Sequence, residues 1–487
     1  MKKKYGLFKV LSILLLIVVV MTYFVKGRQG SISYLALGDV FLNYLQSFYY
    51  FFDTALFILV VGGFYGVLNR IPAYKKMLET FANKVESKSR LFVVLTTIVM
   101  ALISSLTGLN VLLLLVVPMV VSVVLLLGYD KLVALSATVG SIIVGIVGGV
   151  FLTVKDPASY YSVSFATIGE LVGLEGPWTD LLPKILLLVL GLGLLVCYII
   201  RHIKKVEAGN TSYELSNNDV LLVEEKVKTG KKVKADEETN KVRVWPLAVI
   251  LGFVFVLLVL GYLPWNDLFK LDIFTKFHTW LTGLAIGDYK VFSSLISANF
   301  SAFGTWGSLG NYMMAIVVVI ICTFVLMLVY RVKFDDAMDG FLYGIKKMLP
   351  ASLIVMLAYA VLVCSYNHGF METLITMISD KFGDNALVNS FVTLLGSVLN
   401  VDLYYVSAGI FTSVTSSLTD SANLSVYAVM FQSLYGLVQL VGPTSILLIV
   451  GLSYLEVPYK TWLKYIWRFV VELLIVILLV LMLVSLL

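Results

Sequence analysis

The chain has 487 residues, of which 60% are hydrophobic and only 14% are charged, and its formal net charge is +6. Its mean hydropathy is +0.95. Soluble domains carry about a quarter charged residues, so this composition excludes an ordinary soluble protein. Apolar segments of about 20 residues recur along the chain and predict an all-α polytopic membrane protein.

Residues 1–53 are expected to hold one membrane span and an external amphipathic segment. A basic cluster precedes the apolar run Leu7–Val25, and no small-residue cleavage site stands before Lys26. We therefore expect an uncleaved span with the N-terminus inside the cell. Residues 41–52 are aromatic and half-polar, which suits an interface. Residues 54–201 then form a first repeat.

The first repeat is predicted to contain an arm, a hairpin and a broken helix. The arm, 70–90, has six basic and two acidic residues, so the positive-inside rule places it in the cytoplasm. Residues 91–128 are apolar but interrupted by polar residues and glycine at 104–110. This pattern predicts a re-entrant hairpin, although two full crossings would fit the charges equally. A broken helix is expected over 131–166.

Residues 202–244 separate the two halves of the chain. They hold nine basic and eight acidic residues without hydrophobic periodicity, which is typical of a flexible cytoplasmic linker. Residues 245–310 provide a connecting span and an external segment whose aromatic, irregular sequence does not resolve into elements. Residues 311–487 form the second repeat.

The second repeat has the same parts plus one additional span. An interfacial arm at 331–347 precedes the additional span at 350–373, and the hairpin follows at 381–418. A broken helix at 420–456 leads through an aromatic and basic band at 459–468 into the last span. The additional span turns the second hairpin over, so the repeats are expected to be inverted. About nine full spans plus two re-entrant hairpins then place every basic segment in the cytoplasm.

Short sequence matches support the internal repeat. Leu109-Asn110-Val111 recurs as Leu399-Asn400-Val401, and Asp130 recurs as Asp420. Both offsets equal 290 (400 − 110 and 420 − 130). Such short matches arise easily in apolar sequence, and their agreement with the charge pattern gives them weight.

Polar residues, glycine and proline interrupt the apolar segments at the hairpin tips and in the broken helices. In lipid such breaks are tolerated only where protein or a wet cavity surrounds the backbone. Broken helices present N–H groups that attract carboxylates and C=O groups that attract Na⁺, as in secondary transporters. The alternative is that these side chains only satisfy buried backbone or hold helices together. The predicted substrate and ion site comprises Ser104, Ser105, Thr107, Asn110, Asp156, Ser397, Asn400, Asp402, Gly442, Pro443, Thr444 and Ser445.

Asp402 is the most informative single residue. A carboxylate at membrane depth costs ~2.5–3.5 kcal/mol on insertion scales, so it usually has a partner or a function. It could carry a proton, coordinate Na⁺ or pair with a substrate amino group, or it could be solvated at a wet tip. Asn367, His368 and Glu372 are candidates for an access path, or they lie near the outer surface.

The sequence contains no nucleophile–base set, phosphate loop, Walker motif or metal-ligand cluster. It therefore predicts no enzyme, no nucleic-acid partner and no cofactor, with Na⁺ as the one candidate ion. The favoured function is a secondary transporter in the cytoplasmic membrane, moving an amino acid or carboxylate with Na⁺ or H⁺. A cation/proton antiporter or a channel is the alternative. An integral-membrane enzyme is more remote, because it would need clustered His, Asp or Glu residues.

The C-terminal part carries a family resemblance. Gly442–Ser445 (GPTS) and Glu456–Lys464 (EVPYKTWLK) resemble the closing signature of the YfcC/DcuC-like permeases. This family belongs to the ion-transporter superfamily that includes the AbgT and DASS carriers. Leu127–Asp130 and Ser365–Gly369 resemble the family too, and the match covers most of 50–485. The resemblance implies an inverted-repeat, dimeric carrier of elevator type that moves carboxylates, amino acids or related anions with a cation.

Three positions depart from that family. Thr107–Asn110 stands where acidic residues are usual near the first hairpin tip. Ser397–Asp402 replaces a Pro-Ser-Ser-Ser-Gly run at the second tip, and Asp156-Pro157 replaces an Asn-Pro pair. Because the tips are altered, the resemblance does not assign a substrate.

Overall fold

The structure is a computed structural model and is almost entirely helical over the residues that it describes. Two short antiparallel hairpins are the only sheets within those residues. The described residues are 6–24, 34–155, 163–166, 180–209, 243–307, 312–370, 373, 381, 386–399, 401 and 421–485.

Eight helical segments of the described chain are long and apolar enough to cross a membrane. Each has at least 18 residues, and a rise of 1.5 Å per residue makes that enough for most of a bilayer core. The chain is therefore a multi-pass membrane protein. These segments are α1 (Gly6–Phe24), α2 (Leu37–Leu68), α3 (Pro72–Val85) with α4 (Ser89–Thr107), α9 (Leu181–Glu207), α10 (Trp245–Tyr262), α14 (Met313–Tyr330), α15 (Phe334–Asn367) and α21 (Tyr459–Ser485).

Shorter helices lie between these segments. Residues 131–147 form one continuous helix with a π-turn in its middle, and every residue of it is buried. A helix that is apolar on all sides belongs in the centre of a protein, so this helix is central to the fold. The shorter elements are the 3₁₀ turns at Glu86–Lys88 and Leu112–Leu115, α5 (Val117–Leu126), α6 (Lys131–Leu135), the π-turn (Ser136–Gly140), α7 (Ser141–Val147), α17 (Ala386–Leu399), α19 (Ser421–Gln439) and α20 (Ile446–Leu455).

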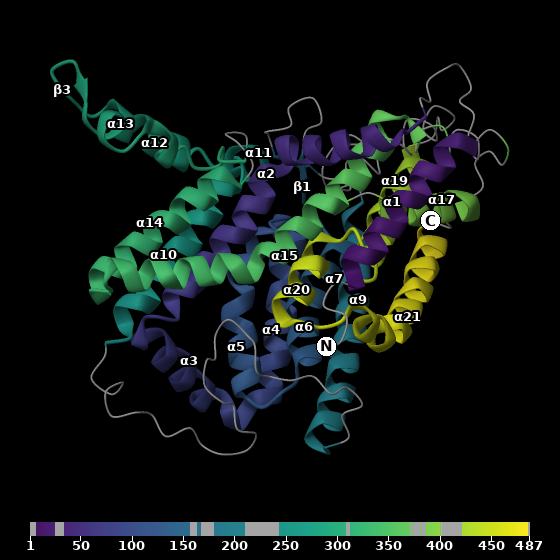
Figure 1. Cartoon of the computed structure of the whole chain (residues 1–487), viewed down its shortest axis with the longest axis horizontal. Helices are drawn as coiled ribbons and strands as arrows, with labels where there is room; N and C mark the ends of the chain where they lie inside the picture. The colour runs from purple at the N-terminus through teal and green to yellow at the C-terminus, as the bar shows by residue number, and fades with distance from the viewer. Residues whose placement is uncertain are drawn as a thin grey trace.

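Residues 265–301 belong to the segment whose sequence did not resolve into elements. They form a projection that leaves the body at the upper left of Figure 1. The other hairpin, β1 (Leu152–Lys155) with β2 (Val163–Ala166), follows the central helix and pairs in antiparallel register. The elements of the projection are α11 (Trp265–Phe269), α12 (Ile273–Gly283), β3 (Ala285–Ile286), β4 (Tyr289–Lys290), α13 (Val291–Leu295) and a 3₁₀ turn (Ala298–Ser301).

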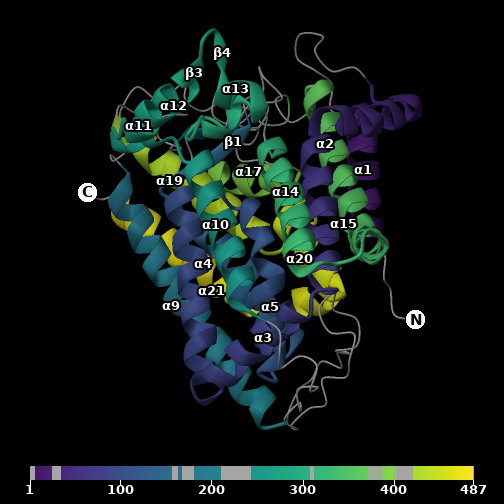
Figure 2. The ribbon, with the colours of Figure 1, turned by 90° about the vertical axis from the view of Figure 1, so that its left-hand side faces the viewer.

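The helices pack as two groups. In the first, which we call the scaffold, α2 and α15 pack along each other and contact α1 and α14, while α10 packs on α14. The second, the hairpin group, contains α4–α7, α9, α17 and α19–α21. Figure 2 shows α1, α2 and α15 on one side and α4, α9 and α21 on the other. Contacts between α15 and α20 join the two groups.

Three predicted boundaries differ from the structure. Residues 41–52 were expected as an interface segment before the first repeat, but they belong to one helix, α2, which is kinked at Phe51 and continues to Leu68. The second arm and the additional span are also one helix, α15, which runs through Pro350. A proline removes one helix hydrogen bond, and packing along α2 compensates for that loss. Helix α9 extends to Glu207, where Lys204 and Lys205 complement the dipole of its last turn.

The first broken helix also differs from its predicted range of 131–166. Its helical part ends at Val147, and Gly148 and Gly149 follow. Residues 152–155 and 163–166 are strands rather than a second half-helix. Glycine pays a large entropic cost in a helix, so two in succession favour an end at this point.

Candidate functional site

The predicted first hairpin tip begins where α4 ends. Gly108 adopts a left-handed conformation (φ 63°) that favours glycine, and its N–H donates to the Ser104 carbonyl at 2.9 Å. The Thr107 hydroxyl donates to the Ile103 carbonyl at 2.5 Å and accepts from the Leu109 N–H at 3.2 Å. Thr107 therefore caps the end of its own helix.

Ser104 and Ser105 connect this tip to the central helix. The Ser104 hydroxyl lies 2.6 Å from Asn110 Oδ1 and 2.7 Å from the Ile142 carbonyl oxygen. The Ser105 hydroxyl donates to the Gly148 carbonyl at 2.8 Å, where α7 breaks. A Cβ on Gly145 would lie 2.5 Å from the Ala101 carbonyl oxygen and 2.6 Å from the Ser104 side chain, so α4 and α7 are in close contact. Ser105 thus bonds at the first break and Ser104 links Asn110 to α7, whereas Thr107 bonds only within its own segment.

The second tip and the second break are linked in a similar way. The Thr444 hydroxyl donates to the Val398 carbonyl at the end of α17, at 2.9 Å. The Tyr435 hydroxyl of α19 donates to the Val401 carbonyl at 2.8 Å. Ser397 donates instead to Thr393 within its own helix. Asn400 and Asp402 lie outside the described residues, as does Asp156 at the first break.

The second break separates α19 from α20 and is buried. Gly442 and Pro443 lie in it, and Ser445 is the N-cap of α20, with its hydroxyl accepting from the Leu448 N–H at 3.4 Å. The other N–H groups of the first turn have no partner four residues earlier in the same helix. A helix start of this kind carries a partial positive charge and attracts anions. The buried N-terminus of α20 is therefore suited to a carboxylate.

Two residues of the family-like signature after α20 donate hydrogen bonds to backbone carbonyls that follow α19 at this break. The indole N–H of Trp462 donates to the Leu440 carbonyl at 2.7 Å, and the Tyr459 hydroxyl donates to the Val441 carbonyl. Trp462 is fully buried, whereas Trp467 in the same helix is exposed. The sequence assigned the whole segment to an interfacial band, which is correct for Trp467 and wrong for Trp462.

The two broken helices meet through a residue that the sequence analysis did not select. The Gln432 side chain of α19 donates to the carbonyl oxygens of Ile146, at 3.1 Å, and of Gly149. A Cβ on Gly436 would lie 2.8 Å from the Val147 nitrogen, so the helices touch. A glutamine inside an apolar helix was the signal available in the sequence.

A buried ion pair beside the first break was also missed. Asp180 and Lys184 lie one turn apart at the start of α9, with 2.8 Å between Oδ2 and Nζ. The backbone of Lys184 packs on the break, because a Cβ on Gly148 would lie 2.6 Å from its carbonyl oxygen. The pair therefore lies on the helix that packs against the first break, and its two buried charges neutralise each other.

Two of the residues predicted for an access path contact helix α2. Asn367 donates to Asn43 Oδ1 at 3.4 Å and to Gln46 Oε1 at 3.2 Å, and His368 Nε2 lies 3.3 Å from Asn43 Nδ2. They therefore belong to the contact between α15 and α2 within the scaffold. Glu372 lies outside the described residues.

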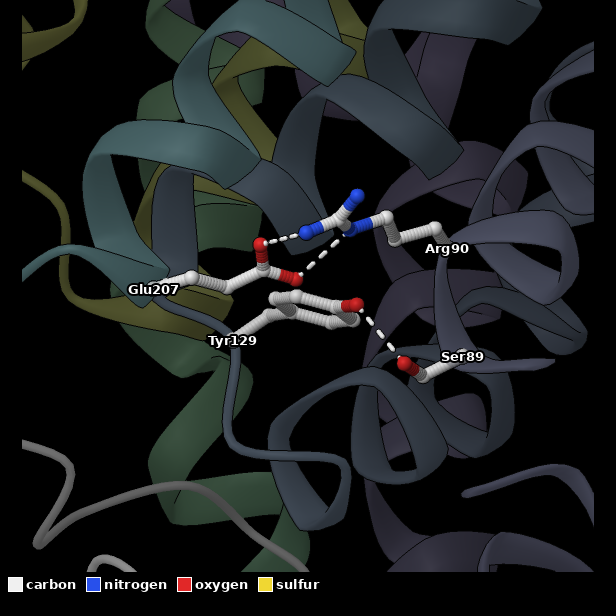
Figure 3. Close-up of polar contacts among 4 residues, drawn as sticks. All are labelled: Ser89, Arg90, Tyr129 and Glu207. Atoms are coloured by element: carbon white, nitrogen blue, oxygen red, sulfur yellow. Dashed lines mark hydrogen bonds and ion pairs between the residues drawn. The ribbon is translucent and has the colours of Figure 1, made fainter. Parts of the chain in front are cut away.

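The opposite end of the hairpin group carries a polar clamp between α4 and α9. Arg90 forms a two-point ion pair with Glu207, with 2.9 Å between Nε and Oε1, and the Tyr129 hydroxyl donates to Ser89 at 2.9 Å (Figure 3). Burial raises the pKa of Tyr129. Next to it, Asp130 caps α6 and lies 2.9 Å from His202 Nε2 of α9.

A narrow apolar cavity lies between the scaffold and the hairpin group. Tyr65 lines it, and the Tyr65 hydroxyl donates to the Leu115 carbonyl at 2.5 Å. Residues from α2 and α15 face residues from α5 and α20 across it. The lining includes Phe57, Val61, Val117, Met348, Val450 and Tyr454.

Comparison with known proteins identifies a family, and a solved transporter structure is among the matches. The family model DcuC, described as C4-dicarboxylate anaerobic carrier, matches residues 6–485. The crystal structure of the YdaH transporter of Alcanivorax borkumensis, described as having an unusual topology, is 11% identical over 99% of this chain and 98% of that chain, with a TM-score of 0.40. Curated proteins include no match to this chain.

Proposed function

Because this chain belongs to the DcuC family of C4-dicarboxylate anaerobic carriers, we propose that it moves a small organic anion, a carboxylate or an amino acid, across the cytoplasmic membrane. The family makes the chain a membrane transporter with a small-molecule substrate. The finer proposal is secondary transport coupled to Na⁺ or H⁺, by an elevator movement, in a homodimer whose N-terminus is inside the cell.

The observation that carries the proposal is the pairing of each hairpin tip with one helix break. Ser105 bonds to Gly148 at the first break, and Thr444 at the second break bonds to Val398 of α17. Two breaks joined to two tips form a site whose free backbone groups can bind ions inside a membrane protein. The N-terminus of α20 carries partial positive charge, which favours an anionic substrate.

The inverted repeat gains support from the sequence matches at an offset of 290 and from the hydrogen bond between a tip and a break that each half contains. The elevator proposal draws on the apolar cavity between the scaffold and the hairpin group, because a face with few polar contacts resists sliding least.

Transport by purified protein in lipid vesicles tests the proposal. We expect saturable uptake of a carboxylate, driven by an imposed Na⁺ or H⁺ gradient without ATP. A panel of C4-dicarboxylates, amino acids and short fatty acids identifies the substrate. Unitary current steps in a planar bilayer would instead indicate a channel, and uptake that ignores both gradients would refute secondary active transport.

A further inference from the structure

The projection formed by residues 265–301 is attached closely to the end of α10. The Gly304 N–H, in the segment that returns from the projection, donates to the Gly261 carbonyl of α10 at 3.0 Å. The Trp306 indole N–H donates to the Asn299 carbonyl of the projection at 3.1 Å. A Cβ on Gly261 would lie 2.1 Å from the fully buried Trp306 ring, so the ring packs directly on the α10 backbone. The projection therefore keeps a defined position relative to α10.

One face of α12 packs inside the projection. The centroid of the Phe274 ring lies 4.9 Å from that of Trp265 and 6.2 Å from that of Phe303. One turn later, His278 Nδ1 lies 2.8 Å from the Ser301 hydroxyl oxygen of the following 3₁₀ turn. Residues of the projection and its base thus already cover this face of the helix.

A second face of α12 is apolar and exposed, and we call it the α12 stripe. Its side chains recur at intervals of four, three and four residues, which places them on one side of the helix. They are Ile273, Phe277, Trp280 and, directly after the helix, Leu284. The exposed Thr275 and Thr279 lie on the other side. An exposed apolar stripe with polar residues opposite it marks a surface that contacts a partner.

The α12 stripe lies close to the membrane boundary. Helix α10 is long and apolar enough to cross the bilayer, and it exposes the apolar side chains of Val249, Phe253 and Val256. It ends at Tyr262, and the projection begins at Trp265. Figure 1 and Figure 2 both show the projection at the ends of α10 and α14 that lie away from α3. The lipid that surrounds α10 therefore borders the projection as well.

We propose that the α12 stripe docks on the lipid surface of the membrane, in the leaflet that these ends of α10 and α14 reach. Continuity with the lipid-facing side of α10 favours lipid as the occupant over a second copy of the chain. Residues 265–301 contain three basic and three acidic residues, so apolar contact, rather than attraction to charged headgroups, would hold the helix. Trp280 supplies an amphipathic ring of the kind that is enriched at the membrane interface. Docking would fix the depth of the ends of α10 and α14 in the bilayer.

Fluorescent labelling of the purified full-length protein in lipid vesicles tests the docking. Trp280→Cys and Ile273→Cys are made in a chain whose three native cysteines are replaced, and each is labelled with an environment-sensitive fluorophore. We expect blue-shifted emission, quenching by lipids that carry a nitroxide on the acyl chain, and a depth of roughly 5–10 Å into the headgroup and acyl boundary. Thr275→Cys, on the polar side of the same helix, is the matched control and should be quenched by aqueous iodide instead.

Three outcomes would overturn the docking. Emission at Trp280 that is quenched by iodide as strongly as at Thr275 would place the stripe in water. Equal quenching of both positions by the nitroxide lipids would mean that α12 has no lipid-facing side. Blue-shifted emission without quenching by these lipids, together with cross-linking of two chains through Trp280→Cys, would mean that a second copy covers the stripe.

Ile273 provides an independent position if labelling at Trp280 disturbs the helix. The fluorescence readout needs no transport activity. Its failure would therefore leave the proposed function standing, and a chain that transports no anion would still show docking.

Discussion

Gly66 and Gly340 touch through their backbones, at the crossing of the two longest helices. A Cβ on Gly66 would lie 2.0 Å from the Gly340 carbonyl oxygen, and one on Gly344 would lie 2.0 Å from the Gly62 oxygen. Small residues spaced four apart allow membrane helices to approach this closely, and the packing gains replace the hydrophobic effect that lipid removes. The contact holds α2 and α15 together as the core of the scaffold.

Gly66→Ala should destabilise the protein, although alanine is the better helix former. The helix gain is about 1 kcal/mol, while overpacking typically costs about 1–3 kcal/mol, and here the obstacle is rigid backbone. The melting temperature in detergent, followed by size-exclusion chromatography, should fall by several degrees. Gly252→Ala in α10 is the control, because nothing lies within 4 Å of its Cβ position. An unchanged melting temperature for Gly66→Ala would contradict the close crossing.

Thr444→Val should slow transport while leaving the protein folded. The substitution keeps the shape of the side chain and removes the hydroxyl that bonds to Val398 at 2.9 Å. An unsatisfied buried carbonyl costs about 1–3 kcal/mol, which corresponds to roughly a 5- to 150-fold change in an equilibrium that depends on this contact. Initial uptake rates in vesicles at equal protein content measure the effect.

Thr97→Val is the matched control for that substitution. Thr97 is also fully buried, but its hydroxyl donates to Val93 within its own helix, α4, at 2.9 Å. Removing this bond disturbs no contact between a tip and a break. Equal uptake by both variants would mean that the Thr444 bond contributes nothing specific to transport.

The clamp in Figure 3 predicts a cross-link on the cytoplasmic side. Arg90→Cys with Glu207→Cys, in a chain whose three native cysteines are replaced, should be joined by a short bismaleimide cross-linker, because the parent side chains meet at their ends and the linker replaces the length that cysteine lacks. A membrane-impermeant maleimide should label each single variant only after the cells are permeabilised. Labelling on intact cells would reverse the orientation inferred from the basic arms.

Two exposed positions complete that topology test. Lys88 lies at the end of the arm that precedes α4, and Lys381 lies near the start of the predicted second hairpin. Lys88→Cys should behave like the clamp positions, whereas Lys381→Cys should react on intact cells. Reaction of both from the same side would refute the inverted arrangement of the two halves.

The sequence predicted the membrane architecture and the breaks because both depend on local composition. Apolar runs of sufficient length became α1, α9, α10 and α14, and the polar interruption at 104–110 became the end of α4. Gly442 and Pro443 do lie between α19 and α20. In these cases the residue that ends a helix lies in the helix or next to it, so local periodicity and composition are enough to predict where the helix ends.

The sequence could not predict features that depend on distant partners. Helix α15 continues through Pro350 because it packs along α2, which lies almost 300 residues earlier in the chain; Ser352 of α15, for example, bonds to Ala55. Gln432 donates to the carbonyls of Gly149 and Ile146, which lie 283 and 286 residues earlier in the chain. Hydrogen-bond partners of this kind arise from tertiary packing, and no local pattern encodes them.

Trp462→Phe should destabilise the second helix break, between α19 and α20, although the substitution is conservative. The ring is retained, but the indole N–H that donates to the Leu440 carbonyl at 2.7 Å is lost. That carbonyl lies just beyond the last residue of α19 and has no helical donor, so it becomes a buried unsatisfied group at a cost of about 1–3 kcal/mol. We expect a lower melting temperature and slower uptake. Trp467→Phe in the same helix, where the side chain is exposed, is the control and should match the parent in both measurements. Equal behaviour of the two variants would mean that Trp462 contributes to helix packing only, and that its hydrogen bond does not stabilise the second break.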